Sequence, residues 1–199
     1  MVIEQNTEQK ILEAAEKVFL QSGYDGARMQ EIADVAGINK AMLHYYFRSK
    51  DALFGKIFDE KVKDFFPEIV ETMQSDALFI DKVDVFIEKY INLMCKYPFI
   101  PFFVLSTVNK SNSEAFIKKL PTQLIQTLAM SYMLAEQNKE VKTVNPFQFI
   151  ISVISLCAFP FVARPIFQTV GQIQMEDFKI LMQERIPELK MYVRLILNP

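Results

Sequence analysis

The sequence predicts an all-α protein with a short N-terminal helix-turn-helix region followed by a larger helical region. Of the 199 residues, 51% are hydrophobic and only five are glycine, three of which fall within the first 40 positions. A protein built from long sheets needs more glycine at its turns, so sparse glycine between long apolar segments favours helices. Prolines separate the apolar segments of the second region, and helices that are apolar on several faces must be covered by neighbours.

The first two helices are expected over residues 7–22 and 28–36. In the first, apolar residues recur at helical spacing while glutamates and lysines occupy the other side. Gly23 follows where a helix C-terminus favours a residue with positive φ. Gly37 ends the second helix in the same way, and a turn of about three residues leads to the next helix. This order is typical of a helix-turn-helix motif.

A third helix is expected over residues 40–47, with Asn39 as its N-cap. At 100° per residue, Leu43 and Phe47 face inward, and Tyr46 lies at the edge of that inward face. The small, polar and aromatic side chains that remain face outward or lie on the flank: Lys40, Ala41, His44 and Tyr45. A helix that approaches the edges of DNA bases needs a face of this kind.

The rest of the chain is expected to form six more helical segments, the first of which is capped by Ser49. They lie near 50–72, 78–96, 99–110, 113–137, 145–163 (with a kinked continuation to about 169) and 175–197. The run 143–163 has no charged residue and is long enough to cross a bilayer. It also contains two prolines and several polar residues, so a helix buried in a core or subunit interface is the better interpretation, and no membrane partner is expected.

Composition argues against several classes of function. The formal net charge of −2 gives no overall attraction to nucleic acid, so a DNA site must arise locally. Cys95 and Cys157 lie far apart in apolar segments, which predicts two buried, reduced thiols and no metal site. His44 is the only histidine and has no nucleophile or carboxylate partner, so neither a catalytic residue nor a cofactor is expected. The N-terminus does not resemble a secretion signal, which predicts a cytoplasmic protein.

The stretch IADVAGINKAMLHYYFRSKDALF resembles the DNA-binding signature of the tetracycline-repressor (TetR) family of bacterial transcription regulators. The resemblance is specific over residues 11–58, through the IA-x-x-AG turn, the aromatic triplet before Phe47, and Lys50. It implies an all-helical, homodimeric repressor that binds a palindromic double-stranded operator and is released by a small-molecule effector. The implied division is a DNA-binding domain over 1–49 and an effector-binding and dimerisation domain over 50–199.

Residue by residue, the resemblance places DNA contacts at the start of the second helix, along the third, and at Lys50, which would contact a phosphate. The implied contacts are Arg28, Met29, Gln30, Asn39, Lys40, Ala41, His44, Tyr45, Tyr46 and Lys50. Two features depart from the family pattern. Ala27 and Arg28 stand where a hydroxyl residue is common, and the histidine precedes the two tyrosines in the triplet.

Local charge supports the same surface without the resemblance. Residues 27–50 carry four cations and two anions, a net charge of +2, whereas residues 1–26 carry two cations and five anions, a net charge of −3. Because phosphate contacts dominate affinity for DNA, the predicted site is where the basic residues are concentrated.

The second region offers candidates for an apolar effector pocket and for a dimer interface. The pocket candidates are Phe65, Tyr90, Met94, Phe102, Phe103, Met130 and Phe161. Long uncharged runs argue against a highly charged effector. The helices near 145–163 and 175–197 are the predicted homodimer contacts, as a four-helix arrangement about a twofold axis. An alternative is a soluble helical carrier of lipophilic molecules whose helix-turn-helix does not bind DNA.

Overall fold

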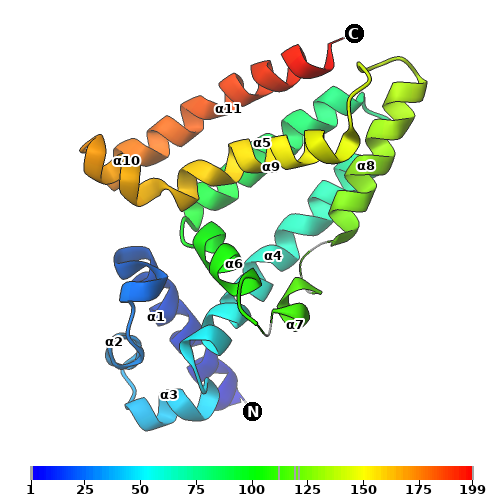
Figure 1. The fold of residues 1–199 in the computed structure, drawn as a ribbon. Helices are drawn as coiled ribbons and strands as arrows, with labels where there is room; N and C mark the ends of the chain where they lie inside the picture. Colours follow the sequence, from blue (N-terminus) through cyan, green and yellow to red (C-terminus); the bar gives the residue numbers. More distant parts are fainter. Residues whose placement is uncertain (1, 112, 119, 121, 199) are drawn as a thin grey trace. The chain divides into compact units, whose positions relative to one another are not determined.

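The computed structural model describes residues 2–111, 113–118, 120 and 122–198, and these residues form helices and no strand. The helices are α1 (Val2–Gly26), α2 (Met29–Ala36), α3 (Lys40–Tyr46), α4 (Lys50–Gln74), α5 (Phe79–Lys96), α6 (Ile100–Val108), α7 (Glu114–Ile117), α8 (Thr122–Gln137), α9 (Pro146–Val162), α10 (Arg164–Val170) and α11 (Met175–Leu197) (Figure 1). The predicted all-α fold is confirmed.

The chain divides into two compact units, residues 1–64 and residues 65–199. The division falls inside α4, so this helix contributes residues to both units. A division of function at residue 49 stays a prediction, since compactness alone does not show which residues bind DNA or an effector.

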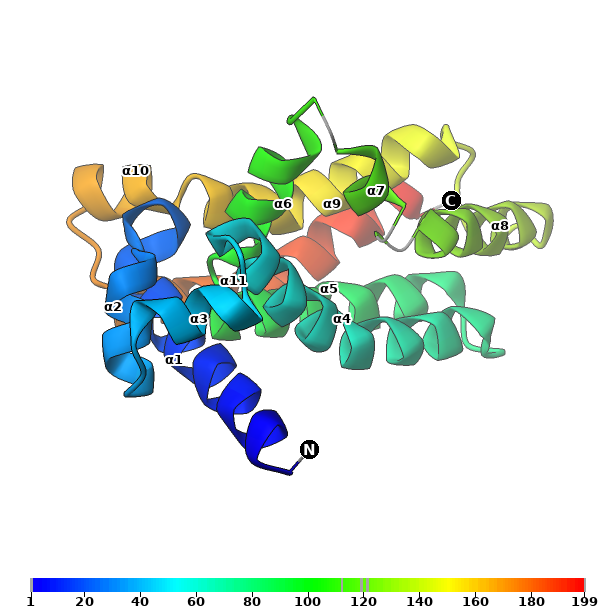
Figure 2. The same ribbon diagram turned by 90° about the horizontal axis from the view of Figure 1, so that it is seen from below.

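The N-terminal unit contains α1, α2, α3 and the first turns of α4 (Figure 2). Gly23 has φ 68° and ψ 178°, which interrupts the helical backbone, but α1 resumes for one more turn to Gly26. The predicted end of the regular helix at residue 22, with a positive φ at Gly23, is therefore confirmed, and one further helical turn follows it. The rings of Phe19, Tyr24 and Phe54 join α1 to α4, with centroids 4.8 Å apart for Phe19 and Phe54 and 5.2 Å apart for Tyr24 and Phe54.

The C-terminal unit is built around α5, α9 and α11, which pack on one another, while α8 packs on α9 (Figure 1). Ion pairs join α5 to α11 on the outside, including Asp84 with Arg194, and Glu88 with Lys190 at 2.9 Å. Lys82 is the only charged side chain among the buried residues of the described chain, and its Nζ donates to the carbonyl of Met73 at 3.1 Å.

The single helix predicted over 113–137 is wrong, because the structure has α7 and α8 in its place. Pro121 falls between these two helices in the sequence and lies outside the described residues. A proline has no N–H for the helical ladder, and it disfavours helical backbone at the residue before it. The kinked continuation predicted after 145–163 is confirmed as α10, which bends from α9 by 52°.

Among the described residues, no single helix combines the length and hydrophobicity that a bilayer crossing needs. Two bent pairs meet that test when taken together, α5 with α6 and α9 with α10, on length and composition alone.

Candidate nucleic-acid interface

The turn between α2 and α3 depends on Gly37, which has φ 69° and ψ 31°. This left-handed conformation suits glycine, because a side chain there adds backbone strain even where space is open. The N–H groups of Gly37 and Ile38 donate to the carbonyls of Asp34 and Ala33 at 3.2 and 3.0 Å, which completes the C-terminus of α2. The chain then turns directly into α3.

The start of α3 is fixed by Asn39, whose Oδ1 accepts a hydrogen bond from the N–H of Met42 at 2.8 Å. The predicted N-cap is therefore confirmed. Leu43 is fully buried and Phe47 is 8% exposed, so these two side chains hold the helix against the unit from behind. The inward face that helical spacing predicts is also confirmed.

The outer face of α3 is open, because Lys40, Ala41 and His44 are exposed and Tyr45 is 79% exposed. Tyr46 is half-buried at the edge of that face, and its ring meets the ring of Tyr45 edge-on with centroids 5.5 Å apart. These side chains point as the wheel predicts, while their contacts with DNA stay predictions.

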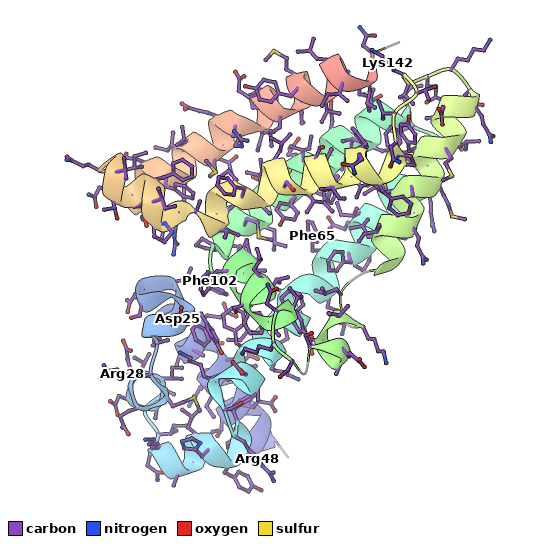
Figure 3. The ribbon with its side chains drawn as sticks, viewed as in Figure 1. Asp25, Arg28, Arg48, Phe65, Phe102 and Lys142 are labelled. Atoms are coloured by element: carbon purple, nitrogen blue, oxygen red, sulfur yellow. The ribbon has the colours of Figure 1, made fainter. Side chains whose placement is uncertain are left out.

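At the start of α2, Arg28 is the N-cap residue in an extended conformation, and its side chain makes no capping hydrogen bond. The side chain is exposed, and Figure 3 labels it beside α2. Gln30 is exposed and its Nε2 donates to Oδ1 of Asp34 at 2.8 Å. Met29 is half-buried, so it contributes more to packing than the two polar residues on either side.

Lys50 differs from the other predicted contacts, because its ammonium is already occupied. Its Nζ donates to the carbonyls of Tyr24, Asp25 and Ala27 at 2.6, 3.3 and 3.1 Å. These acceptors lie 23 to 26 positions earlier in the chain, so no helical spacing in the sequence shows them. Ser49 behaves as predicted, since its Oγ accepts from the N–H of Ala52 at 3.1 Å.

The predicted effector residues are dispersed through the C-terminal unit. Phe65 and Tyr90 come together with ring centroids 6.4 Å apart, and burial raises the pKa of the Tyr90 phenol above its ordinary value. Met94, Phe103 and Phe161 are buried in the packing of the unit. Their joint role in a pocket stays a prediction.

Two of the predicted effector residues lie at the surface instead. Phe102 on α6 is 40% exposed, and Met130 on α8 is 71% exposed. Figure 3 labels Phe65 and Phe102 on their separate helices. In the part of the chain that the structure describes, no group of three or more His, Cys, Asp or Glu side chains could hold a metal ion.

The fold and this surface define a helix-turn-helix protein of the kind that binds DNA. Residues 11–57 match the family described as bacterial regulatory proteins, tetR family. The chain is 27% identical over 85 residues to the fatty acid metabolism regulator protein of Bacillus subtilis (strain 168), covering 43% of this chain and 44% of that protein. It is 31% identical over 88 residues to the HTH-type transcriptional regulator RutR of Escherichia coli (strain K12), covering 44% of this chain and 41% of RutR. The match thus spans less than half the length of these relatives.

A solved structure extends the likeness to the whole fold. The crystal structure of AibR in complex with isovaleryl coenzyme A and operator DNA matches with a TM-score of 0.70 and 19% identity, covering 97% of this chain and 99% of AibR. Residues 11–57 thus carry the DNA-binding region of the TetR family of bacterial transcription regulators, and the curated relatives that match this part of the chain are regulatory proteins. The relatives named here are regulatory proteins and not enzymes, in agreement with the sequence.

Proposed function

We propose that this protein is a ligand-responsive transcription regulator that binds a palindromic operator as a homodimer and represses transcription until an effector releases it. The observation that carries the proposal is the arrangement of α3. Leu43 and Phe47 are buried behind the helix, while a continuous set of polar, small and aromatic side chains is exposed in front. A helix supported in this way can enter the major groove with its outer face against the bases.

The exposed side chains divide by chemistry into two groups. The Lys40 ammonium can donate to O6 and N7 of guanine, and the Ala41 methyl can contact the methyl group of thymine. His44 lies on the same face and contacts a neighbouring base. The backbone contacts come from donors at the edges: the Arg28 guanidinium, the Tyr45 and Tyr46 hydroxyls, and the Nδ2 group of Asn39, whose Oδ1 caps α3.

The effector that we propose is small and mainly apolar. Among the described residues, α6 and α9 carry no charged side chain and α8 carries only Glu136, next to its last residue, so the interior of the C-terminal unit is suited to an apolar molecule. The name of one similar protein agrees with this class, since it regulates fatty acid metabolism. The isovaleryl coenzyme A bound to AibR agrees with it only through the apolar acyl group, because the coenzyme A part is charged.

The homodimer that we propose forms through α9 and α11. On α9, Phe147, Ile151 and Phe159 are each more than half exposed, at spacings of four and eight residues on one side of the helix. On α11, Ile180 and Leu195 are exposed in the same way. Exposed apolar side chains in such numbers mark a surface that another protein covers, and a twofold axis brings the same surface of a second copy against it. Such a DNA-binding protein acts in the cytoplasm.

The experiment that tests the function is selection of binding sites from random duplexes, followed by footprinting of the selected duplex. We expect a protected dyad with two half-sites about one helical turn apart, as a dimeric helix-turn-helix protein requires. Between about 50 and 200 mM salt the affinity should fall by roughly 1,000-fold or more, because bound phosphates release counterions.

Two variants separate the contacts within this experiment. Tyr45→Ala should weaken binding to all duplexes, whereas Tyr45→Phe isolates the part that the hydroxyl contributes. Absence of any protected dyad at low salt contradicts the proposal. If the protein instead takes up lipophilic molecules and binds no duplex, the carrier is the correct class.

A further inference from the structure

The ammonium group of Lys50 is enclosed by backbone carbonyls of its own unit. An ammonium has three N–H donors, and the three carbonyl oxygens of Tyr24, Asp25 and Ala27 lie within hydrogen-bond distance of Nζ, at 2.6, 3.3 and 3.1 Å. Two of these bonds are part-buried. The donors are therefore used within the protein.

The surroundings of Lys50 favour a cation held in place. Its Nζ lies 4.5 Å from the centroid of the Tyr24 ring, which provides a cation–π contact. The carbonyls belong to the last turn of α1 and the residue that follows it, where the helix dipole is negative. The Tyr24 ring packs in turn against Phe54 of α4. Lys50 and Phe54 thus attach the first turns of α4 to the end of α1.

A phosphate could contact this ammonium only if one of the three carbonyls lost its donor. Lys40 provides the contrast, since it is exposed at the start of α3 and has no hydrogen-bond or ion-pair partner among the described residues. Of the two lysines predicted to contact DNA, only Lys40 presents an unused ammonium to solvent.

Lys50 binds the backbone directly before the start of α2. The Ala27 carbonyl that it binds precedes Arg28, the extended N-cap residue of α2, by one peptide bond. We infer that Lys50 is a positioning residue, whose ammonium fixes the corner between α1 and α2 so that Arg28 and Gln30 reach the DNA backbone. It does not neutralise a phosphate itself. This inference rests on the proposed function, and it assigns to Lys50 a different task from the one implied by the resemblance.

Salt dependence distinguishes the two tasks. The affinity of Lys50→Met, Lys50→Gln and Lys40→Met for the selected operator is measured over a series of salt concentrations. A lost phosphate contact makes the slope of log affinity against log salt shallower by about 1, whereas lost positioning lowers affinity and leaves that slope unchanged. We expect Lys50→Met to bind roughly 10-fold more weakly at every salt concentration with the wild-type slope, and Lys50→Gln to lose less.

Lys40→Met is the matched control for the same substitution at an exposed site. It should make the slope shallower and leave the melting temperature unchanged, while Lys50→Met should lower the melting temperature by roughly 5 °C. A shallower slope for Lys50→Gln with an unchanged melting temperature overturns the inference. Lys50→Gln keeps two amide donors, so it gives an answer even if Lys50→Met folds poorly.

A double-mutant cycle with Arg28→Ala tests what is positioned, at a temperature where circular dichroism shows every variant folded. If Lys50 acts through Arg28, then Lys50→Met should weaken binding less in the Arg28→Ala background than in the wild type. Strictly additive losses indicate general destabilisation and contradict the inference.

A readout without DNA keeps the inference separate from the proposed function. The N–H groups of Ala27 and Ile32 bond to the carbonyls of Gly23 and Arg28 at 3.3 and 3.1 Å. Their hydrogen exchange should speed up in Lys50→Met and not in Lys40→Met. Unchanged exchange refutes the positioning role of Lys50 whether or not the wild type binds DNA, whereas a wild type that binds no duplex refutes the proposed function alone.

Discussion

Cys157 of α9 is 1% exposed, and burial raises the pKa of its thiol to about 12, although the nearby Arg185 acts in the opposite direction. Only the thiolate reacts readily with alkylating agents, and an ordinary cysteine has a pKa of about 8.5. The half-buried Cys95 also has a raised pKa, again because of burial. Both thiols are therefore protonated and shielded at neutral pH.

We predict that iodoacetamide at pH 8 leaves Cys157 unmodified in the native protein and modifies it after denaturation, which peptide mass mapping can measure. The sign of the pH effect on stability follows, because the folded state keeps the proton longer than the unfolded state. The contribution is complete below the pKa of the unfolded thiol and is lost as the pH rises from about 9 to about 12. Rapid labelling of native Cys157 would contradict this account.

At the residue scale, the sequence was sufficient to predict the direction of a side chain where the periodicity of a single helix determines it. The spacing along α3 predicts which side chains face inward, and burial of Leu43 with exposure of Tyr45 agrees with it. Lys50 could not be predicted in this way, because its partners are main-chain oxygens of another helix. Backbone acceptors carry no residue type that a sequence pattern could show.

Helix α9 shows how one element depends on another. Pro160 lies inside α9 and has no N–H, so the carbonyl of Leu156, four residues earlier, lacks its usual helical donor. Arg185 of α11 supplies the missing donors, with its Nε 3.3 Å and its Nη2 3.2 Å from that oxygen. The carbonyl that Pro160 leaves without a helical donor in α9 is therefore hydrogen-bonded by a side chain of α11, which packs against α9.

We predict that Arg185→Met destabilises the protein by about 2 kcal/mol, because it removes charged hydrogen bonds from a part-buried acceptor. Urea unfolding followed by circular dichroism measures the loss. Lys190→Met is the control on the same helix. Lys190 pairs with the exposed Glu88 at 2.9 Å, so its loss should cost no more than about 1 kcal/mol. Equal costs for the two variants would rule out a special role for Arg185.

The boundaries of elements were predictable where a cap or a proline marks them. Asn39, Ser49 and Asn145 precede helices that begin as expected, and the side chain of each accepts from the backbone ahead of it. The segment over residues 113–137 was predicted as one helix, whereas the structure has α7 and α8 there.

At the scale of the whole molecule, the exposed apolar surface of α9 and α11 determines the expected assembly. We predict that Phe159→Glu shifts the protein from dimer to monomer in sedimentation velocity, because a buried charge at a twofold interface meets its own copy. Operator affinity should fall in parallel, since one monomer contacts one half-site.

Leu78→Glu is the control, as Leu78 is 55% exposed at the start of α5, outside both helices. It should leave the dimer intact. A Phe159→Glu variant that sediments as a dimer would place the interface elsewhere. The sequence predicts these two helices as the dimer contacts, and only α9 of the two lacks charge. Which of their side chains remain uncovered required the packing of α5 against both.

The two units share a helix, and this limits how parts of such regulators can be exchanged. Leu53, Phe54, Ile57 and Phe58 of α4 are buried in the N-terminal unit, which extends to residue 64. A chimaera joined before Lys50 takes these side chains from a foreign protein and leaves the hydrophobic interior behind α3 mismatched. A junction after residue 64 keeps that interior native, so the sensory half of a relative is best grafted within the helix.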